Sequence, residues 1–307
     1  MISIFGYGSL MNVVSAKRTM PNATNFRPGE LCGYTRCYNL VSISGIKSGL
    51  VNLDTKEMAA LSIRKVDNST VIDDETNDIS PRVSGIIFDI PEDESIPYFE
   101  REHRYKPVQI NVTESESHRV INVWSIIEQT DAEYKTSILN SVSQQLITPP
   151  ESENSSGQCL NNEELVIFAQ TEYNNRVGQY YQGQLWGRND IYPMPKYCIS
   201  CLLAAFDLGG VDYVVNMLEH TLLADGHTSL HVYLKDKVSY IDPCTLGSMT
   251  DLPNCYDPRL YESLTQDKLM TREEGLDIQH SEPDHTVHGI ADKNGITLYS
   301  IIHRVIV

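Results

Sequence analysis

Ile2-Ser3-Ile4-Phe5-Gly6-Tyr7-Gly8-Ser9-Leu10, close to the start of the chain, is the stretch that decides the fold. Its first apolar residues predict a short strand, and Gly6 and Gly8 let the backbone turn sharply after it. Successive backbone N–H groups in such a turn point outward and can bind an anion or a developing oxyanion. A plain tight turn is the simpler interpretation of a lone Gly-x-Gly, so other residues must decide.

Nucleotide-binding and hydrolase motifs fit the chain poorly. Met11 stands where a dinucleotide-binding loop needs its third glycine, and no parallel βαβ pattern follows. The sequence also has no P-loop, no Gly-x-Ser-x-Gly elbow and no His-Glu-x-x-His. We therefore expect neither a nucleotide cofactor nor a catalytic metal.

Charge and composition narrow the class of protein. The 307 residues include 24 Lys and Arg against 41 Asp and Glu, a formal net charge of −17. This acidity disfavours nucleic acids and anionic membranes as partners. We find no apolar run near the roughly 18 residues that span a bilayer, and no signal peptide at the start. The odd number of cysteines, 7, suits a reducing compartment. We expect a cytoplasmic protein acting on small molecules or on other proteins.

Short strands dominate the chain up to about residue 130. Besides Ile2–Phe5, the strands predicted from apolar alternation are Glu30–Ser42, Met58–Val66, Val83–Ile90, Val108–Val112 and Val120–Ile127. Strands this short and this close together, with turn signals between them, predict a barrel or a strongly curved sheet.

Helical spacing takes over in the second half. The predicted helices are Ala132–Leu146, Glu163–Tyr173, Lys196–Leu208 and, after Gly209-Gly210, Val211–Leu223. His231–Leu234 and Gly295–Val307 predict two more strands, and residues 67–80 predict an exposed loop. Residues 148–162 predict a mobile linker. We expect one domain over residues 1–235 and a C-terminal extension, 236–307, whose role the sequence does not indicate.

A second group of chemistry-bearing residues is Tyr98-Phe99-Glu100-Arg101-Glu102-His103-Arg104-Tyr105. Two carboxylates stand among arginines, a histidine and aromatic rings, a setting typical of groups that gain and lose protons during a reaction. A solvated, self-paired charged turn is the alternative.

Together the two motifs resemble the γ-glutamylcyclotransferase-like superfamily. The matching segments, in chain order, are Tyr7-Gly8-Ser9-Leu10, Gly33-Tyr34-Thr35-Arg36, Ala59-Ala60-Leu61-Ser62-Ile63, Ser84-Gly85-Ile86-Ile87-Phe88-Asp89-Ile90-Pro91 and Arg101-Glu102-His103-Arg104-Tyr105. A later segment, Pro193-Met194-Pro195-Lys196-Tyr197, matches the family's "Pro-x-x-Tyr, helix, Gly" pattern. The resemblance covers residues 1–125 well and 190–222 less closely.

This resemblance implies an α+β fold, with a small mixed β-barrel flanked by α-helices. It implies that Glu102 is the catalytic general acid and base and that a γ-glutamyl peptide or amine, glutathione included, is cyclised to 5-oxoproline without cofactor or metal. Residues implied to line the substrate site are Phe5, Gly6, Tyr7, Gly8, Ser9, Leu10 and Tyr197. The family often has Leu-Asp ahead of the glutamate where this chain has Tyr98-Phe99, which keeps Glu100 as an alternative to Glu102. Helix-start packing is the alternative role for Tyr197.

Other functions stay open at this point. The linker and the extension are consistent with a non-catalytic module that binds a γ-glutamyl-like ligand or a protein on the same fold. Acyl or amine transfer would use the same glutamate. A Glu102 near the Tyr7–Leu10 amides favours catalysis, whereas a Glu102 paired with Arg101 or Arg104 and pointing outward favours binding. The sequence does not indicate the oligomeric state.

Two residue groups have simpler interpretations than metal binding. Cys198-x-x-Cys201 lies in an apolar helix, where cysteine packs as a small hydrophobic residue. His280, His285 and His288 stand among acidic residues, which predicts an acidic surface loop in preference to a carboxylate–histidine metal site.

Overall fold

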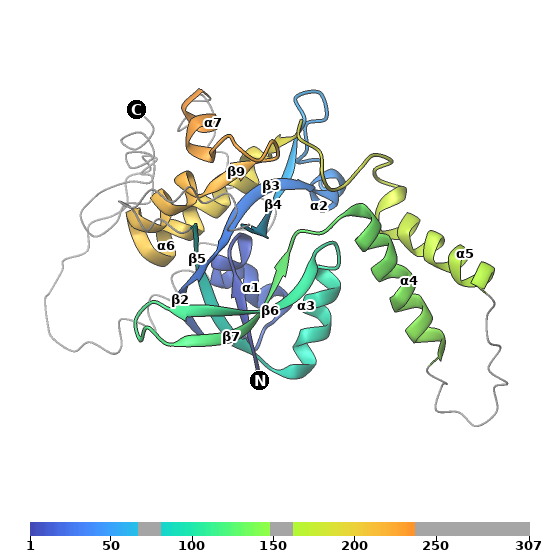
Figure 1. Cartoon of the computed structure of the whole chain (residues 1–307), viewed down its shortest axis with the longest axis horizontal. Coiled ribbons are helices and arrows are strands. Elements are labelled where there is room, and N and C mark those ends of the chain that lie inside the picture. Colours follow the sequence, from blue (N-terminus) through green and yellow to red (C-terminus); the bar gives the residue numbers. More distant parts are fainter. Residues whose placement is uncertain (67–80, 148–161, 237–307) are drawn as a thin grey trace, which may run out of the picture.

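The computed structural model describes residues 1–66, 81–147 and 162–236, which form a closed barrel, a second sheet and flanking helices (Figure 1). The barrel has the strand order β1-β5-β2-β6-β7. Its strands are β1 (Ile2–Gly6), β2 (Thr24–Cys32), β5 (Arg82–Ile90), β6 (Lys106–Glu114) and β7 (Val120–Ile127). β1 is antiparallel to β5 and parallel to β7, so the barrel is mixed. The predicted α+β fold with a small mixed barrel is confirmed.

A four-stranded sheet lies beside the barrel, in the order β8-β4-β3-β9. It consists of β3 (Tyr34–Val41), β4 (Glu57–Lys65), β8 (Tyr192–Pro193) and β9 (Thr221–Leu223). β3 and β4 form an antiparallel hairpin, whereas β8 and β9 join the edges in parallel. The late part of the chain is thereby fixed against its beginning.

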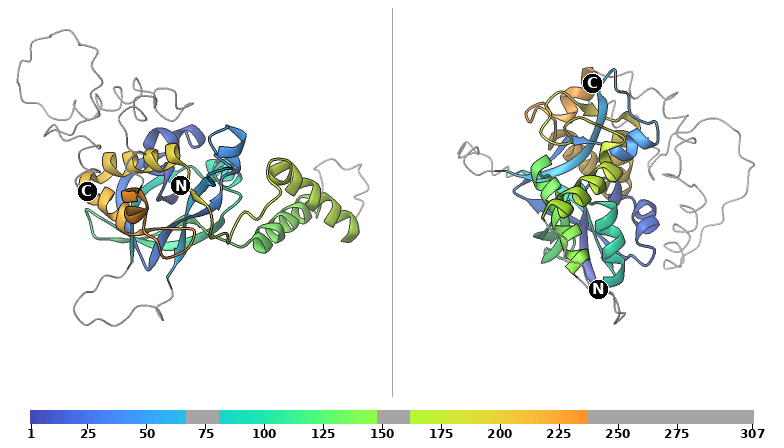
Figure 2. Two further views of the ribbon diagram at one scale, coloured as in Figure 1. Left: turned by 90° about the horizontal axis from the view of Figure 1, so that it is seen from above. Right: turned by 90° about the vertical axis from the view of Figure 1, so that its right-hand side faces the viewer.

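Helices cover this core and also extend from it. They are α1 (Val13–Thr19), α2 (Ile43–Lys47), α3 (Ser95–Arg101), α4 (Asp131–Ile147), α5 (Asn162–Tyr173), α6 (Pro195–Glu219) and α7 (Leu230–Asp236). α6 lies along the barrel, whereas α4 and α5 pack against each other and project away from it (Figure 2).

The structure confirms most of the predicted elements and corrects others. Glu30–Ser42 is not one strand but the end of β2 and all of β3, because the chain reverses at Gly33, whose φ of +76° suits glycine. Residues 13–19, for which the sequence analysis predicts no helix, form α1, whose first turn is capped by the Asn12 side chain accepting from the Ser15 N–H at 2.9 Å.

Two further corrections concern the end of the described chain. His231–Leu234 is part of helix α7 rather than a strand, since Ser229 accepts from the Val232 and Tyr233 N–H groups and caps the turn. The helix predicted to end at Leu223 ends at Glu219, and the chain continues as β9. The 67–80 loop, the linker up to residue 161, the Gly295–Val307 strand and the C-terminal extension lie outside the described residues.

Helix α6 meets the length and composition test for a membrane span, which corrects the expectation that no stretch does. A buried core helix passes the same test, and α6 buries Cys198, Cys201, Leu202 and other apolar side chains in the core. It is also interrupted at Gly209-Gly210, where Gly210 has a φ of +66°. These features are those of a core helix.

Arg36, on β3, ties the two sheets together from inside the protein. Its side chain is fully buried, and its Nε donates to the Tyr7 carbonyl at 3.1 Å. Its Nη1 donates to Asn216 Oδ1 on α6 at 2.9 Å, and its Nη2 donates to the Ser84 carbonyl on β5. Burial lowers the pKa of Arg36 to about 10, so it remains charged at neutral pH. One guanidinium thus joins the loop after β1 to β3, β5 and α6.

Replacing Arg36 tests this arrangement. Arg36→Met leaves the two carbonyls and Asn216 without their charged donor, and we expect a loss of about 3 kcal/mol in the free energy of unfolding, measured in urea. Arg82→Gln is the matched control, because that β5 arginine is 46% exposed and lies 3.9 Å from Glu30. It should cost less than about 1 kcal/mol. Equal losses in the two variants would contradict the role of Arg36.

Candidate active site

One pocket gathers every site residue that the sequence predicted. It lies where the end of β1, the loop after it, β4, β7, the end of α3 and the start of α6 meet. The lining residues are Phe5, Gly6, Tyr7, Gly8, Ser9, Leu10, Leu61, Glu102, Tyr105, Ile126 and Tyr197. About 310 Å³ between them is free of protein atoms, part of it open to solvent.

The loop that forms one wall is a short 3₁₀ turn, Ser9–Met11. The Met11 N–H donates to the Gly8 carbonyl at 2.9 Å, and Arg36 holds the Tyr7 carbonyl from behind. The first N–H groups of a helical turn have no acceptor within the turn. Those of Gly8, Ser9 and Leu10 are therefore the groups of this wall that can bind an anion or an oxyanion.

Gly8 and Tyr197 are in close contact across the pocket. A Cβ atom built on Gly8 would lie 3.0 Å from the Tyr197 hydroxyl oxygen, and its next neighbour, Leu61, would be 3.5 Å away. Tyr197 stands at the start of α6, and its ring meets Tyr38 edge-on, with ring centres 6.3 Å apart. The tyrosine thus both packs the start of the helix and reaches the loop.

Glu102 lies at the opposite wall, directly after helix α3. Its backbone N–H donates to the Tyr98 carbonyl at 3.0 Å, which makes it the C-terminal cap of the helix. Its side chain is only 12% exposed, and Oε1 is 3.0 Å from Arg101 Nε. Glu100, the alternative, is exposed on α3 and does not line the pocket. The placement therefore favours Glu102 over Glu100.

The sequence analysis gave one arrangement of Glu102 that favours catalysis and another that favours binding, and the structure has features of both. Glu102 pairs with Arg101, which the binding hypothesis expected, yet it lines the pocket together with the Tyr7–Leu10 loop, which the catalytic hypothesis expected. It does not point outward.

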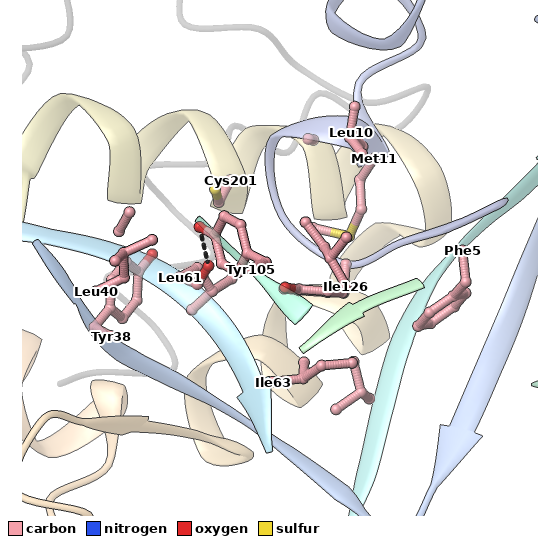
Figure 3. Packing of buried hydrophobic residues seen from close by; sticks show 14 of the residues in the cluster. Phe5, Leu10, Met11, Tyr38, Leu40, Leu61, Ile63, Tyr105, Ile126 and Cys201 are labelled. Carbon is pink, nitrogen blue, oxygen red and sulfur yellow. Dashed lines mark hydrogen bonds between the residues drawn. The ribbon is translucent and has the colours of Figure 1, made fainter. Parts of the chain in front are cut away.

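Tyrosines surround this carboxylate. Burial raises the pKa values of Tyr7, Tyr98 and Tyr105, and the nearby charge of Glu102 raises them further. Burial also raises the pKa of Tyr197. All of these hydroxyls are neutral near pH 7 and can act as hydrogen-bond donors. Tyr105 already donates to the Leu61 carbonyl at 2.9 Å (Figure 3).

His103 and Arg104, which follow Glu102, contact the projecting helices. His103 Nδ1 lies 2.7 Å from the Tyr134 hydroxyl on α4. Burial, helped by the charges of Arg104, Arg176 and Lys47, lowers the pKa of His103 to about 3. The imidazole is therefore neutral at physiological pH, and neither residue lines the pocket.

Sequence reasoning missed several pocket residues. Leu61 comes from the middle of β4 and Ile126 from near the end of β7, where an apolar residue signals a core position and nothing more (Figure 3). Tyr105 belongs to the motif at residues 98–105, but the sequence predicts no role for it. Its spacing from Glu102 was the available signal, since the Tyr105 N–H donates to the Glu102 carbonyl at 2.9 Å and turns both side chains to the pocket.

Comparison with known proteins gives structural likeness alone. No protein-family model matches the chain, and no curated protein does. Among solved structures, an uncharacterized protein from Homo sapiens is 14% identical, with a TM-score of 0.32, over 55% of this chain and 98% of its own.

A structure described as a γ-glutamyl cyclotransferase is 13% identical, with a TM-score of 0.31, over 55% of this chain and 98% of its own. A yeast γ-glutamyl cyclotransferase specific to glutathione is 14% identical, with a TM-score of 0.30, over 55% and 96%. The chain is similar to γ-glutamyl cyclotransferases. At these TM-scores and identities the likeness does not indicate activity, so function has to be inferred from the pocket.

The part of the chain that the structure describes contains no set of side chains that could bind a metal ion. No group of three or more His, Cys, Asp or Glu side chains comes together there. Cys198 and Cys201 are free thiols buried in the core, as predicted, and burial raises the pKa of each to about 12. His280, His285 and His288 lie outside the described residues.

The contact between Gly8 and Tyr197 can be tested in a double-mutant cycle. We expect Gly8→Ala to cost about 1–3 kcal/mol in unfolding free energy, because the new methyl group presses on the tyrosine hydroxyl. In Tyr197→Phe that oxygen is gone, so the same change should cost less. Urea unfolding of the four proteins measures the coupling, and strictly additive effects would contradict the contact.

Proposed function

We propose that this protein cyclises a γ-glutamyl peptide or amine to 5-oxoproline and releases the amine, with Glu102 moving the proton. The observation that carries the proposal is the pocket itself, in which a nearly buried carboxylate shares a small space with the turn after β1, whose first N–H groups have no acceptor within the turn.

The reaction needs little more than folding of the substrate and proton transfer. The α-amino nitrogen of the γ-glutamyl group attacks the γ-carbonyl carbon of the same molecule, so nucleophile and electrophile are already joined. Glu102 takes a proton from the ammonium group, which frees the lone pair for attack. After the ring C–N bond has formed, Glu102 returns the proton to the leaving nitrogen as the amide C–N bond breaks, and the second proton that the ring nitrogen loses passes by way of Glu102 to the released amine, which leaves as an ammonium ion. One carboxylate thus serves both steps.

The tetrahedral intermediate carries a negative charge on the former carbonyl oxygen. The N–H groups at the start of the Ser9–Met11 turn are suited to bind that oxygen, because Arg36 fixes the loop through the Tyr7 carbonyl before any substrate arrives.

The local cations matter because the whole chain has a net charge of −17. A γ-glutamyl substrate carries a carboxylate, which the overall field repels. Arg36 lies buried behind the loop and Arg101 lies beside Glu102, so the pocket has positive charge close by. The site therefore fits a small anionic molecule that also carries an ammonium group.

A non-catalytic binding module is the second candidate. The ion pair between Arg101 and Glu102 favours it, since a carboxylate held by an arginine can bind a ligand without moving a proton. Both candidates predict a small γ-glutamyl-like ligand in the same pocket.

A cytoplasmic location belongs to the same proposal, and the free thiols of Cys32, Cys37, Cys198 and Cys201 support it.

Incubating the purified protein with glutathione and a panel of γ-glutamyl dipeptides and amines tests the proposal. We expect 5-oxoproline from at least one substrate. Glu102→Gln should lower turnover by about 100-fold or more, because an amide cannot move the proton. Glu100→Gln is the matched control, since Glu100 is exposed outside the pocket, and it should stay within about twofold of the unchanged protein.

Two results would contradict the proposal, the first its catalysis and the second the role of Glu102. One is no 5-oxoproline from any substrate together with calorimetric binding of 5-oxoproline, which favours the binding module. The other is undiminished turnover in Glu102→Gln.

A further inference from the structure

Arg101, the last residue of α3, reaches in two directions at once. Its Nε lies 3.0 Å from Glu102 Oε1. Its Nη1 donates to Thr19 Oγ1 at 2.7 Å and to the Ser15 carbonyl at 3.4 Å. Thr19 and Ser15 belong to α1, which follows the pocket loop directly. The guanidinium therefore links α1, the helix that follows the pocket loop, to Glu102, although Arg101 itself does not line the pocket.

Glu102 needs such a support because of its place in the chain. It caps the end of α3, where the helix no longer restricts the side chain through a following turn. The guanidinium itself is anchored on a second helix, and its planar fork loses little freedom when it binds a carboxylate. The ion pair joins the Arg101 Nε to the Glu102 Oε1.

We propose that Arg101 is a positioning residue, which holds the Glu102 carboxylate in place at the pocket. The inference rests on the proposed function, since it concerns the group that moves the proton there. A base that accepts a proton from an ammonium group must lie within hydrogen-bond reach of that group when the substrate binds.

The groups that face Glu102 support this assignment. Tyr7 from the loop, Tyr98 from α3 and Tyr105 from the segment before β6 each interact electrostatically with it. Their pKa values are raised, so they are neutral and do not balance its charge. The positive charge of Arg104 acts to lower the pKa of His103 and that of Tyr105. Arg101 is the cation that the structure places in direct contact with the carboxylate.

A double-mutant cycle tests the pairing without reference to activity. The unfolding equilibrium in urea is measured for the unchanged protein, Arg101→Gln, Glu102→Gln and the double variant. At pH 7 we expect a coupling of at least about threefold in the equilibrium constant. The coupling should fade as pH falls and the carboxylate is protonated. Additive effects at pH 7 would overturn the inference whether or not the protein is an enzyme.

The kinetics of 5-oxoproline release test the positioning role. In Arg101→Gln we expect kcat to fall by about 10–100-fold with little change in KM, because the carboxylate is displaced. Arg101→Lys should restore part of kcat but not all of it, since an ammonium group keeps the charge without the planar guanidinium. Thr19→Val, which removes only the anchor, should lower kcat by a smaller factor.

Arg18→Gln is the control, because it removes the same charge from an exposed position on α1. It should leave kcat and KM unchanged. An Arg101→Gln variant with unchanged kcat and KM, beside an inactive Glu102→Gln, would overturn the positioning role and leave the proposed function standing. An unchanged protein that releases no 5-oxoproline contradicts the proposed function, and the coupling measured in urea then decides the pairing alone.

Discussion

A single buried cation, Arg36, is the interaction on which the rest of the structure depends. Its guanidinium donates to the Tyr7 carbonyl, to the Ser84 carbonyl and to Asn216, and so joins the loop, the barrel and α6. A buried charge is costly unless its donors are satisfied, so the three acceptors must keep their places. The loop amides are fixed as a consequence. The pocket is therefore rigid on its loop side before a ligand enters, which is the condition for binding an oxyanion without reorganisation.

The opposite wall depends on a second arginine. Arg101 links α1 to Glu102 across the end of α3. Both walls are thus held by guanidinium groups that lie outside the pocket lining, and the lining itself is apolar or neutral apart from Glu102. This division suits proton transfer by one carboxylate, because no other charged side chain among the described lining residues competes for the proton.

Sequence reasoning predicted the barrel and the site residues because both leave local signals. Val83–Ile90 alternates as a strand, and Gly6, Gly8 and Glu102 belong to short motifs in a fixed order. Leu61 and Ile126 could not be predicted, since an apolar residue in a strand looks the same in the core and at a pocket. The strand predicted at His231–Leu234 was wrong. Polar and apolar residues alternate there, whereas Ser229, the residue that caps helix α7, stands before this stretch. The bridging role of Arg101 depends on a contact with Thr19 that sequence order does not show.

The central claim is that the turn amides and Glu102 bind the same small molecule from two sides. A crystal structure of the protein soaked with 5-oxoproline tests it most directly. The account predicts the lactam oxygen within hydrogen-bond distance of the Gly8–Leu10 N–H groups, and the ring nitrogen within reach of Glu102, directly or through one water. A product molecule bound elsewhere, or lying in the pocket without contact to either wall, would contradict it.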